Sequence, residues 1–197
     1  MEIEHTNDQE LILRYYQGDG EALKVVFKRY KDSLFNFALR FAGNRADAED
    51  AVSHAFMTVC ERRYAVKPGA SFKTWLFTVT RNICLSKIRG RSKFYSLWFT
   101  KKDSEENEQI DVIDTKANSR DELDQKEIMA IIQKAVHQLP GEQKEALLLR
   151  EYQGFTYEEI AQVLDCSLEK VKVLIFRARN HLKDVLPPVL LEGGSVK

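Results

Sequence analysis

Positively charged side chains recur between residues 170 and 179, on a segment whose apolar residues follow a helical period. Lysine and arginine neutralise DNA phosphates, and arginine, asparagine and apolar side chains can contact base edges in the grooves. The candidates for such contacts are Lys170, Lys172, Val173, Phe176, Arg177, Arg179 and Asn180. Val173 and Phe176 could touch thymine methyl groups or pack on a neighbouring helix. The set predicts a DNA contact without assigning any base.

The surrounding sequence, TYEEIAQVLDCSLEKVKVLIFRAR from residue 156, predicts a helix-turn-helix that would hold these side chains. Thr156 and Glu159 have the spacing of a capping box, which starts a helix. Asp165 lies in the turn, where a positive φ is usual and aspartate is one of the few non-glycine residues that tolerate it. Ser167 can cap the second helix, and the small Ala161 suits the point where the two helices cross.

A helical wheel divides the second helix into two faces. The inward face holds Leu168, Val171, Ile175, Ala178 and Leu182, and the opposite face holds Glu169, Lys170, Val173, Phe176, Arg177 and Asn180. Lys172 and Arg179 lie at the boundary, from which they could reach phosphates. A helical hairpin without DNA is the alternative, but the small residue, the turn and the caps together favour a DNA-binding unit.

Charge is distributed unevenly along this chain of 197 residues, whose net charge is zero. Residues 61–101 hold 10 basic and 1 acidic side chains, a net of +9, whereas residues 102–128 hold 4 basic and 10 acidic ones, a net of −6. Such segregation favours a polyanionic partner for the basic segment. A basic solvated face without a partner is the other explanation.

The chain otherwise consists of helical patterns. One amphipathic helix is expected from near Glu21 to Gly43, with apolar positions at Phe27, Tyr30, Leu34, Phe37, Ala38 and Phe41. A second follows Asn44 to about Arg63, and Ser71 can cap a third. The third should bury Phe72, Trp75, Leu76, Val79 and Ile83.

These patterns predict an all-α protein of two small helical domains, at residues 10–101 and 121–186. The acidic segment 102–120 has few large apolar residues and is expected to be a flexible linker. The second domain should have four helices, including the helix-turn-helix. Its first helix places Leu123, Ile128, Ile131, Ile132, Ala135 and Leu139 at helical spacing, and its second ends at Gly154.

The sequence gives no sign of catalysis, of a metal or of a cofactor. HExxH, P-loop and GxSxG patterns are absent, and His5, His54, His137 and His181 lack the spacing of metal ligands. Cys60, Cys84 and Cys166 form no CxxC pair and are expected to be buried, reduced thiols of a cytoplasmic protein. Cys166 lies in the turn and could instead be exposed. The acidic amino terminus is unlike a signal peptide, and no apolar run is long enough for membrane insertion.

The ordered set of motifs resembles the bacterial RNA polymerase sigma factors of the extracytoplasmic-function group. LPGEQKEALLLREYQGFTYEEIAQVLDCSLEKVKVLIFRARNHL is similar to their carboxy-terminal DNA-binding domain. DAEDAVSHAFMTVCE followed by SFKTWLFTVTRNICLSKIRGRSK is similar to their other main domain. The resemblance implies that the chain recruits core RNA polymerase to promoter DNA, assists strand opening, and is held inactive by an anti-sigma protein.

The resemblance also implies residue roles. On the DAEDAVSHAFMTVCE helix the exposed face would dock on the polymerase, through Asp50, Ser53, His54, Met57 and Glu61. Ser53 and His54 replace the Gln-Glu pair common in the family. Recognition of the −10 element would involve the loop 64–71 and the helix after it, with Lys67, Lys73, Arg81, Asn82, Lys87, Arg89 and Arg91 as contacts.

The carboxy-terminal helix would enter the major groove of the −35 element, but here the sequence departs from the family. VKVLIFRAR stands where runs like VKSRLHRAR are common, so Val173, Leu174 and Phe176 replace polar residues. This predicts a different promoter sequence, or greater reliance on phosphates and DNA shape.

The alternative function is a dimeric regulator that binds duplex operators through the same helix-turn-helix. The basic block outside that motif argues against it.

Overall fold

The computed structural model describes residues 6–61, 71–98, 120–188 and 190, and side chains within these ranges except for 91–98 and 120–126. The described residues form helices and no strand, which confirms the all-α prediction. The helices are α1 (Asp8–Tyr16), α2 (Gly20–Ala42), α3 (Arg45–Glu61), α4 (Phe72–Trp98), α5 (Arg120–His137), α6 (Gly141–Glu151), α7 (Tyr157–Leu164) and α8 (Leu168–Val185). None of the described helices meets the length and hydropathy needed to cross a bilayer.

Helices α1 to α4 form the first lobe, and local capping signals set their ends. The Asn7 and Asp19 side chains accept backbone N–H groups at the starts of α1 and α2. Gly43 ends α2 with a φ of 83°, a left-handed conformation that suits glycine. Ser71 accepts the Thr74 N–H at 3.0 Å and so caps α4, as predicted.

The core of the first lobe confirms most of the predicted apolar positions. Leu34, Phe37 and Ala38 are fully buried where α2 packs on α3 and α4, and Phe41 is nearly so. Phe27 differs from the prediction. It is 44% exposed, with its ring against that of Phe56 at a centroid distance of 4.8 Å, because it lies at the edge of the α2–α3 contact. Phe72 and Leu76 of α4 are buried as expected, and Trp75, Val79 and Ile83 are half-buried.

Helices α5 to α8 form the second lobe, whose core includes Leu148, Leu149, Ile160 and Ile175. Ile128 and Ile131, at helical spacing on α5, are 37% and 43% exposed, because α5 packs on α8 and α2 along its other side. Cys84 is buried as expected, and Cys166 in the turn is half-buried, but Cys60 is exposed on α3, contrary to the prediction.

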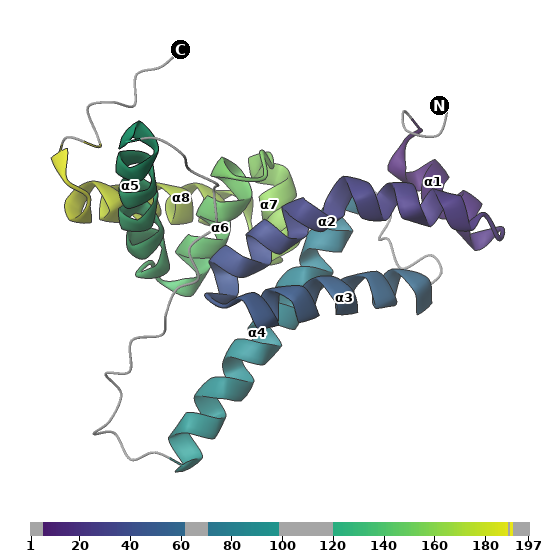
Figure 1. Cartoon of the computed structure of the whole chain (residues 1–197), viewed down its shortest axis with the longest axis horizontal. Coiled ribbons are helices and arrows are strands. Elements are labelled where there is room, and N and C mark those ends of the chain that lie inside the picture. The colour runs from purple at the N-terminus through teal and green to yellow at the C-terminus, as the bar shows by residue number, and fades with distance from the viewer. Residues whose placement is uncertain (1–5, 62–70, 99–119, 189, 191–197) are drawn as a thin grey trace.

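The two lobes pack against each other, which the linked-domain prediction did not anticipate. The first half of α4 lies against α7, and α2 lies against α6 and α5. The carboxy-terminal end of α4 projects away from both lobes (Figure 1). The predicted linker, 102–120, lies outside the described residues apart from Arg120, the first residue of α5.

Candidate nucleic-acid interface

The helix-turn-helix has the local geometry that its sequence predicts. Thr156 accepts the Glu159 N–H at 3.2 Å while the Glu159 carboxylate accepts the Thr156 N–H at 2.8 Å, which completes the capping box. Asp165 has a φ of 53° and ends α7 in the left-handed conformation. Ser167 accepts the Lys170 N–H at 3.2 Å and caps α8. Local chemistry therefore fixes the angle at which α8 leaves the turn.

The predicted DNA-contacting residues share the solvent-facing side of α8. All of them are exposed: Lys170, Lys172, Val173, Phe176, Arg177, Arg179 and Asn180. Val173 is 45% exposed and Phe176 is 65% exposed, so a large part of each side chain faces solvent. Leu174 also replaces a polar residue of the family motif, but it does not share the exposure of Val173 and Phe176. It is 7% exposed, because it lies on the inward side with Val171 and Ala178. The exposed face of α8 therefore combines cations with two apolar side chains.

Two of the α8 cations are held by carboxylates of α6. Lys170 Nζ lies 2.8 Å from Glu142 Oε1, and Arg179 Nη2 lies 2.7 Å from Glu151 Oε1. The hydrogen bond to Glu142 raises the pKa of Lys170. Lys172 and Arg177 have no ion pair within the described residues. These two cations are therefore available to phosphates without loss of an internal contact.

The predicted −10 residues do not form one continuous strip. Lys73 and Arg81 are half-buried and contact the second lobe. Lys73 Nζ donates to the Gln153 carbonyl oxygen at 2.9 Å, and Arg81 forms an ion pair with Glu145. Asn82 and Arg89 are exposed on the same helix. Lys67 lies outside the described residues, and Arg91 lies on α4 but its side chain is among those not described.

Lys87 connects the predicted DNA surface to the predicted polymerase-docking surface. Its Nζ lies 2.8 Å from Asp50 Oδ2 and 3.5 Å from Asp47 Oδ1, so α4 and α3 are joined by charge. The hydrogen bond from Lys87 holds the pKa of Asp50 below its usual value. Two residues predicted for separate partners thus neutralise each other in the isolated chain.

The predicted docking face of α3 is open to solvent. Its five members are all exposed: Asp50, Ser53, His54, Met57 and Glu61. The Ser53 hydroxyl donates to the Glu49 carbonyl oxygen at 2.9 Å, so it turns back on its own helix. Met57 is 47% exposed and gives the face an apolar centre. A helix face with a carboxylate at each end and a methionine between them can receive another helix.

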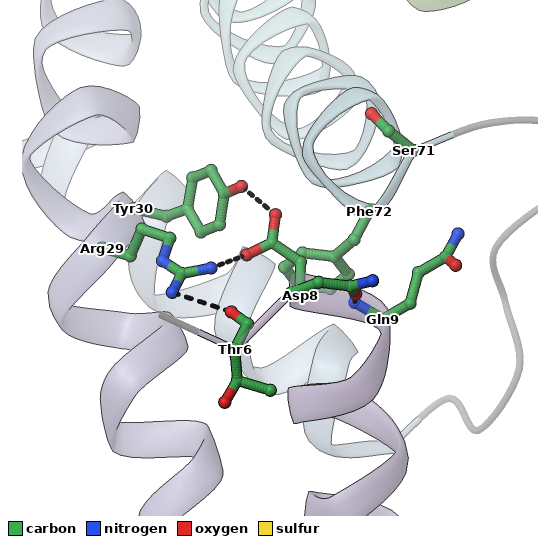
Figure 2. A pocket seen from close by; sticks show the side chains of 8 residues that line it. Thr6, Asp8, Gln9, Arg29, Tyr30, Ser71 and Phe72 are labelled. Carbon is green, nitrogen blue, oxygen red and sulfur yellow. Dashed lines mark hydrogen bonds and ion pairs between the residues drawn. The ribbon is translucent and has the colours of Figure 1, made fainter. Parts of the chain in front are cut away.

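A pocket of about 680 Å³ lies beside the start of α4. Figure 2 shows the side chains that line it. The pocket is lined by Thr6, Asn7, Asp8, Gln9, Arg29, Tyr30, Ser71 and Phe72. Asp8 accepts from both Arg29 and Tyr30, and Arg29 also donates to the Thr6 carbonyl oxygen at 3.1 Å. Burial, with the bond to Asp8, raises the pKa of Tyr30. Because its charged groups satisfy one another, this network anchors α1 on α2.

In the described residues no group of three or more metal-ligating side chains comes together.

Two residues that were not predicted as part of a site, Glu145 and Phe155, meet α4 across the lobes. Phe155 is fully buried, with its ring 5.0 Å from that of Phe77. Glu145 is 2% exposed although it is charged. One signal was present in the sequence. Glu145 precedes Leu148 and Leu149 by three and four residues, so it shares their buried face, and a carboxylate there requires a cationic partner.

Models of known protein families match residues in both lobes. The family model described as "Sigma-70 region 2" matches residues 26–94, and "Sigma-70, region 4" matches residues 129–182. The chain is 29% identical over 199 residues to the RNA polymerase sigma-H factor of Pseudomonas aeruginosa, covering 94% of this chain and 97% of that one. It is 27% identical over 191 residues to the ECF RNA polymerase sigma-E factor of Haemophilus influenzae, covering 95% and 99%.

Solved structures give the same assignment. The sigma factor RpoE from Bartonella quintana, in complex with the anti-sigma factor NepR, superposes with a TM-score of 0.65 at 27% identity, covering 82% of this chain and 94% of that one. CnrH, in complex with the cytosolic domain of CnrY, has the same fold with a TM-score of 0.65 at 21% identity, covering 95% and 99%. With both regions matched in order and relatives of nearly equal length, this chain belongs to the extracytoplasmic-function group of bacterial RNA polymerase sigma factors.

Proposed function

We propose that this protein binds core RNA polymerase and directs it to promoters, where the second lobe recognises the −35 element and the first lobe recognises and opens the −10 element. The observation that carries the proposal is the order of the two regions on one chain, with a cation-bearing, solvent-exposed α8 in the second. A dimeric operator-binding regulator would not need a sigma region 2, so the family match favours initiation. We assign residues 10–101 and 121–186 to the two domains and 102–120 to the connection.

The test is transcription in vitro from a promoter library, using core polymerase with and without this chain. New start sites that require the added protein, each preceded by a shared pair of sequence elements, are expected. A library in which the start sites are the same in both reactions would contradict the proposal.

In the second lobe, α8 is proposed to enter the major groove of the −35 element. Lys170, Arg177 and Asn180 would contact base edges or phosphates. Lys172 and Arg179 would contact phosphates beside them. Val173 and Phe176 are exposed large apolar side chains, so they can contact thymine methyl groups, which are the apolar feature of the major groove. This gives the two apolar side chains a direct role in base selection.

The thymine contact predicts sensitivity to a single methyl group. Replacing thymine by uracil in the −35 element removes that methyl and leaves base pairing and phosphates unchanged. We expect the polymerase holoenzyme to bind the uracil duplex about fourfold to fifteenfold less tightly, because burying one or two methylene-sized groups stabilises by about 0.8 kcal/mol each. The double variant Val173→Ala with Phe176→Ala should bind both duplexes equally. A wild-type protein that does not distinguish the duplexes would reject the contact.

In the first lobe, Asp50, Ser53, His54, Met57 and Glu61 are proposed to dock on the polymerase, since their shared face is exposed. Lys67, Lys73, Arg81, Asn82, Lys87, Arg89 and Arg91 are proposed to contact the −10 strand. For Lys73, Arg81 and Lys87 this requires leaving the partners that hold them in the isolated chain. An opened strand offers base faces and phosphates, which cations along α4 can bind.

Asp50→Lys is expected to weaken binding to core polymerase at least tenfold, because it reverses a charge at the proposed docking face and loses the bond to Lys87. Co-purification and fluorescence titration with core polymerase, in the absence of DNA, would measure it. The double variant Asp50→Lys with Lys87→Glu serves as the control, because it restores an α3–α4 ion pair. If the double variant recovers full affinity, Asp50 acts only within the fold.

Control by an inhibitor protein is also proposed. The Bartonella quintana RpoE and CnrH structures are complexes, one with an anti-sigma factor and one with the cytosolic domain of CnrY. A protein that covers the exposed face of α3 would block polymerase docking. We expect such an anti-sigma partner, and we expect this chain to act in the cytoplasm, where the polymerase is.

A further inference from the structure

An acidic side chain, Glu169, lies among the cations and apolar groups on the proposed DNA-facing side of α8. It is the second residue of the helix, directly after Leu168, and it is exposed. DNA carries a negative charge at every phosphate, so a carboxylate on this side is unfavourable unless it meets a hydrogen-bond donor. The proposed contacts of the neighbouring residues do not explain its presence.

Helical geometry places Glu169 at the centre of the exposed side of α8. At about 100° of rotation per residue, its side chain leaves the helix within about 40° of the directions of Val173 and Phe176. Val171 and Ala178 are fully buried, and they lie about 160–180° from Glu169 around the helix axis. The carboxylate therefore extends away from the core, in the same direction as the side chains proposed to meet the bases.

Glu169 has no partner in the part of the chain that the structure describes. Its neighbour Lys170 is held by Glu142 of α6 at 2.8 Å. Lys172 has the i,i+3 spacing at which a helical ion pair can form, yet among the described residues it forms none with Glu169. Apart from the helix dipole, which favours an acidic residue in the first turn, the fold gives this carboxylate no role.

The position of Glu169 along α8 suits a contact with a base edge. In a helix-turn-helix, residues near the amino end of the second helix reach the bases in the major groove. Glu169 precedes Val173 by one turn, which is about 6 Å along the axis, and neighbouring base pairs are about 3.4 Å apart. A base met by Glu169 therefore lies within about two base pairs of the thymine proposed for Val173.

The bases differ in what they offer a carboxylate in the major groove. Guanine presents the O6 and N7 acceptors and thymine presents the O4 acceptor, and a carboxylate is repelled by all three. Cytosine and adenine each present an amino group, which can donate. Adenine also presents the N7 acceptor beside its amino group, whereas cytosine has no acceptor on that edge. A carboxylate therefore fits cytosine best.

We infer that Glu169 is a specificity-determining residue of α8, whose carboxylate accepts a hydrogen bond from the N4 amino group of a cytosine in the −35 element. The inference rests on the proposed function for the entry of α8 into the major groove. Guanine or thymine at that position leaves the carboxylate without a donor and close to phosphates, so Glu169 also rejects incorrect sites. It adds a polar, base-selective contact to a helix face whose other DNA contacts are mainly cationic and apolar.

The test selects sequences from a duplex library randomised across the −35 element, using polymerase holoenzyme that contains the wild type or a variant. The wild type should prefer cytosine at one position by about fivefold or more over each other base. Glu169→Gln should change the preferred base at that position to adenine, because a glutamine amide can donate to N7 and accept from the N6 amino group. Glu169→Asp keeps the carboxylate and should keep the preference for cytosine.

Asp184→Asn is the matched control, because it removes one exposed carboxylate near the other end of the same helix. It loses the same charge as Glu169→Gln, but it should select the same bases as the wild type at every position. If the wild type and Glu169→Gln select the same base throughout the element, the inference is overturned. If Glu169→Gln proves unfolded by circular dichroism, Glu169→Ala decides, since it should lose the preference for cytosine at that position and retention would overturn the inference.

Failure of this inference and failure of the proposed function give different results. A holoenzyme that yields new transcripts, but whose selected bases do not respond to Glu169→Gln, would keep the proposed function and lose the cytosine contact. The selection is therefore repeated with the full chain alone. A chain that yields no new transcripts, but that by itself selects cytosine as wild type and adenine as Glu169→Gln, would lose the proposed function and keep the base contact.

Discussion

Arg177→Ala is expected to weaken binding of the polymerase holoenzyme to the −35 element by roughly 5-fold to 150-fold, equivalent to about 1–3 kcal/mol. Arg177 is exposed on the same side of α8 as Lys170 and Val173, and no ion pair in the described residues holds it. Its loss therefore removes a contact to DNA without disturbing the fold. Footprinting of the upstream promoter region at several salt concentrations would measure the change and its salt dependence.

The salt dependence separates two roles for Arg177. A lost phosphate contact reduces the slope of log affinity against log salt by about one and weakens all promoters alike. A lost base contact changes the preferred sequence at one position. Lys24→Ala is the control, because Lys24 is an exposed cation of the first lobe. An upstream footprint equal to that of the wild type would mean that this side of α8 does not face DNA.

Phe77→Ala is expected to lower the free energy of unfolding by about 3–5 kcal/mol, the usual cost of removing a buried phenylalanine ring. Phe77 is fully buried. The centroid of its ring lies 5.4 Å from that of the Phe37 ring and 5.0 Å from that of the Phe155 ring. The substitution therefore leaves a cavity that touches both lobes. Urea unfolding followed by circular dichroism would measure the loss.

Phe176→Ala is the matched control, since it makes the same truncation at a ring that is 65% exposed. Its free energy of unfolding should stay within about 0.5 kcal/mol of the wild type, as is usual for surface substitutions. Equal effects of the two substitutions would mean that Phe77 does not fill the core between the lobes. The pair also separates stability from DNA recognition, because only the Phe176 variant should alter preference for thymine.

The sequence was sufficient for features that depend on neighbouring residues. The Thr156–Glu159 capping box, the left-handed Asp165 and the Ser167 cap each follow from contacts over four residues or fewer, and all three predictions are confirmed. The exposed faces of α3 and α8 follow from helical period, since residues three and four apart share a side. Leu174 occupies a position that is polar in the family motif. Its spacing from Val171 and Ala178 nevertheless indicates the inward side, where the structure places it.

Residue type alone gave weaker predictions. Cys60 was expected to be buried because cysteine usually is, but it follows Ser53 and Met57 along the exposed side of α3. Ile128 and Ile131 show that helical apolar spacing does not ensure burial. Whether such a side chain is covered depends on which elements pack against it, and among the described helices α5 packs on α2 and α8.

By itself, the sequence determined the helices, their caps, the turn of the DNA-binding unit and the family, because these depend on local spacing and on an ordered set of motifs. Only the tertiary structure decided that Lys73 and Arg81, predicted as free DNA contacts, are engaged by Gln153 and Glu145. Those partners lie 80 and 64 residues further along the chain. Charge and helical period describe a residue and its neighbours. Which distant carboxylate neutralises a cation is fixed by how the lobes pack.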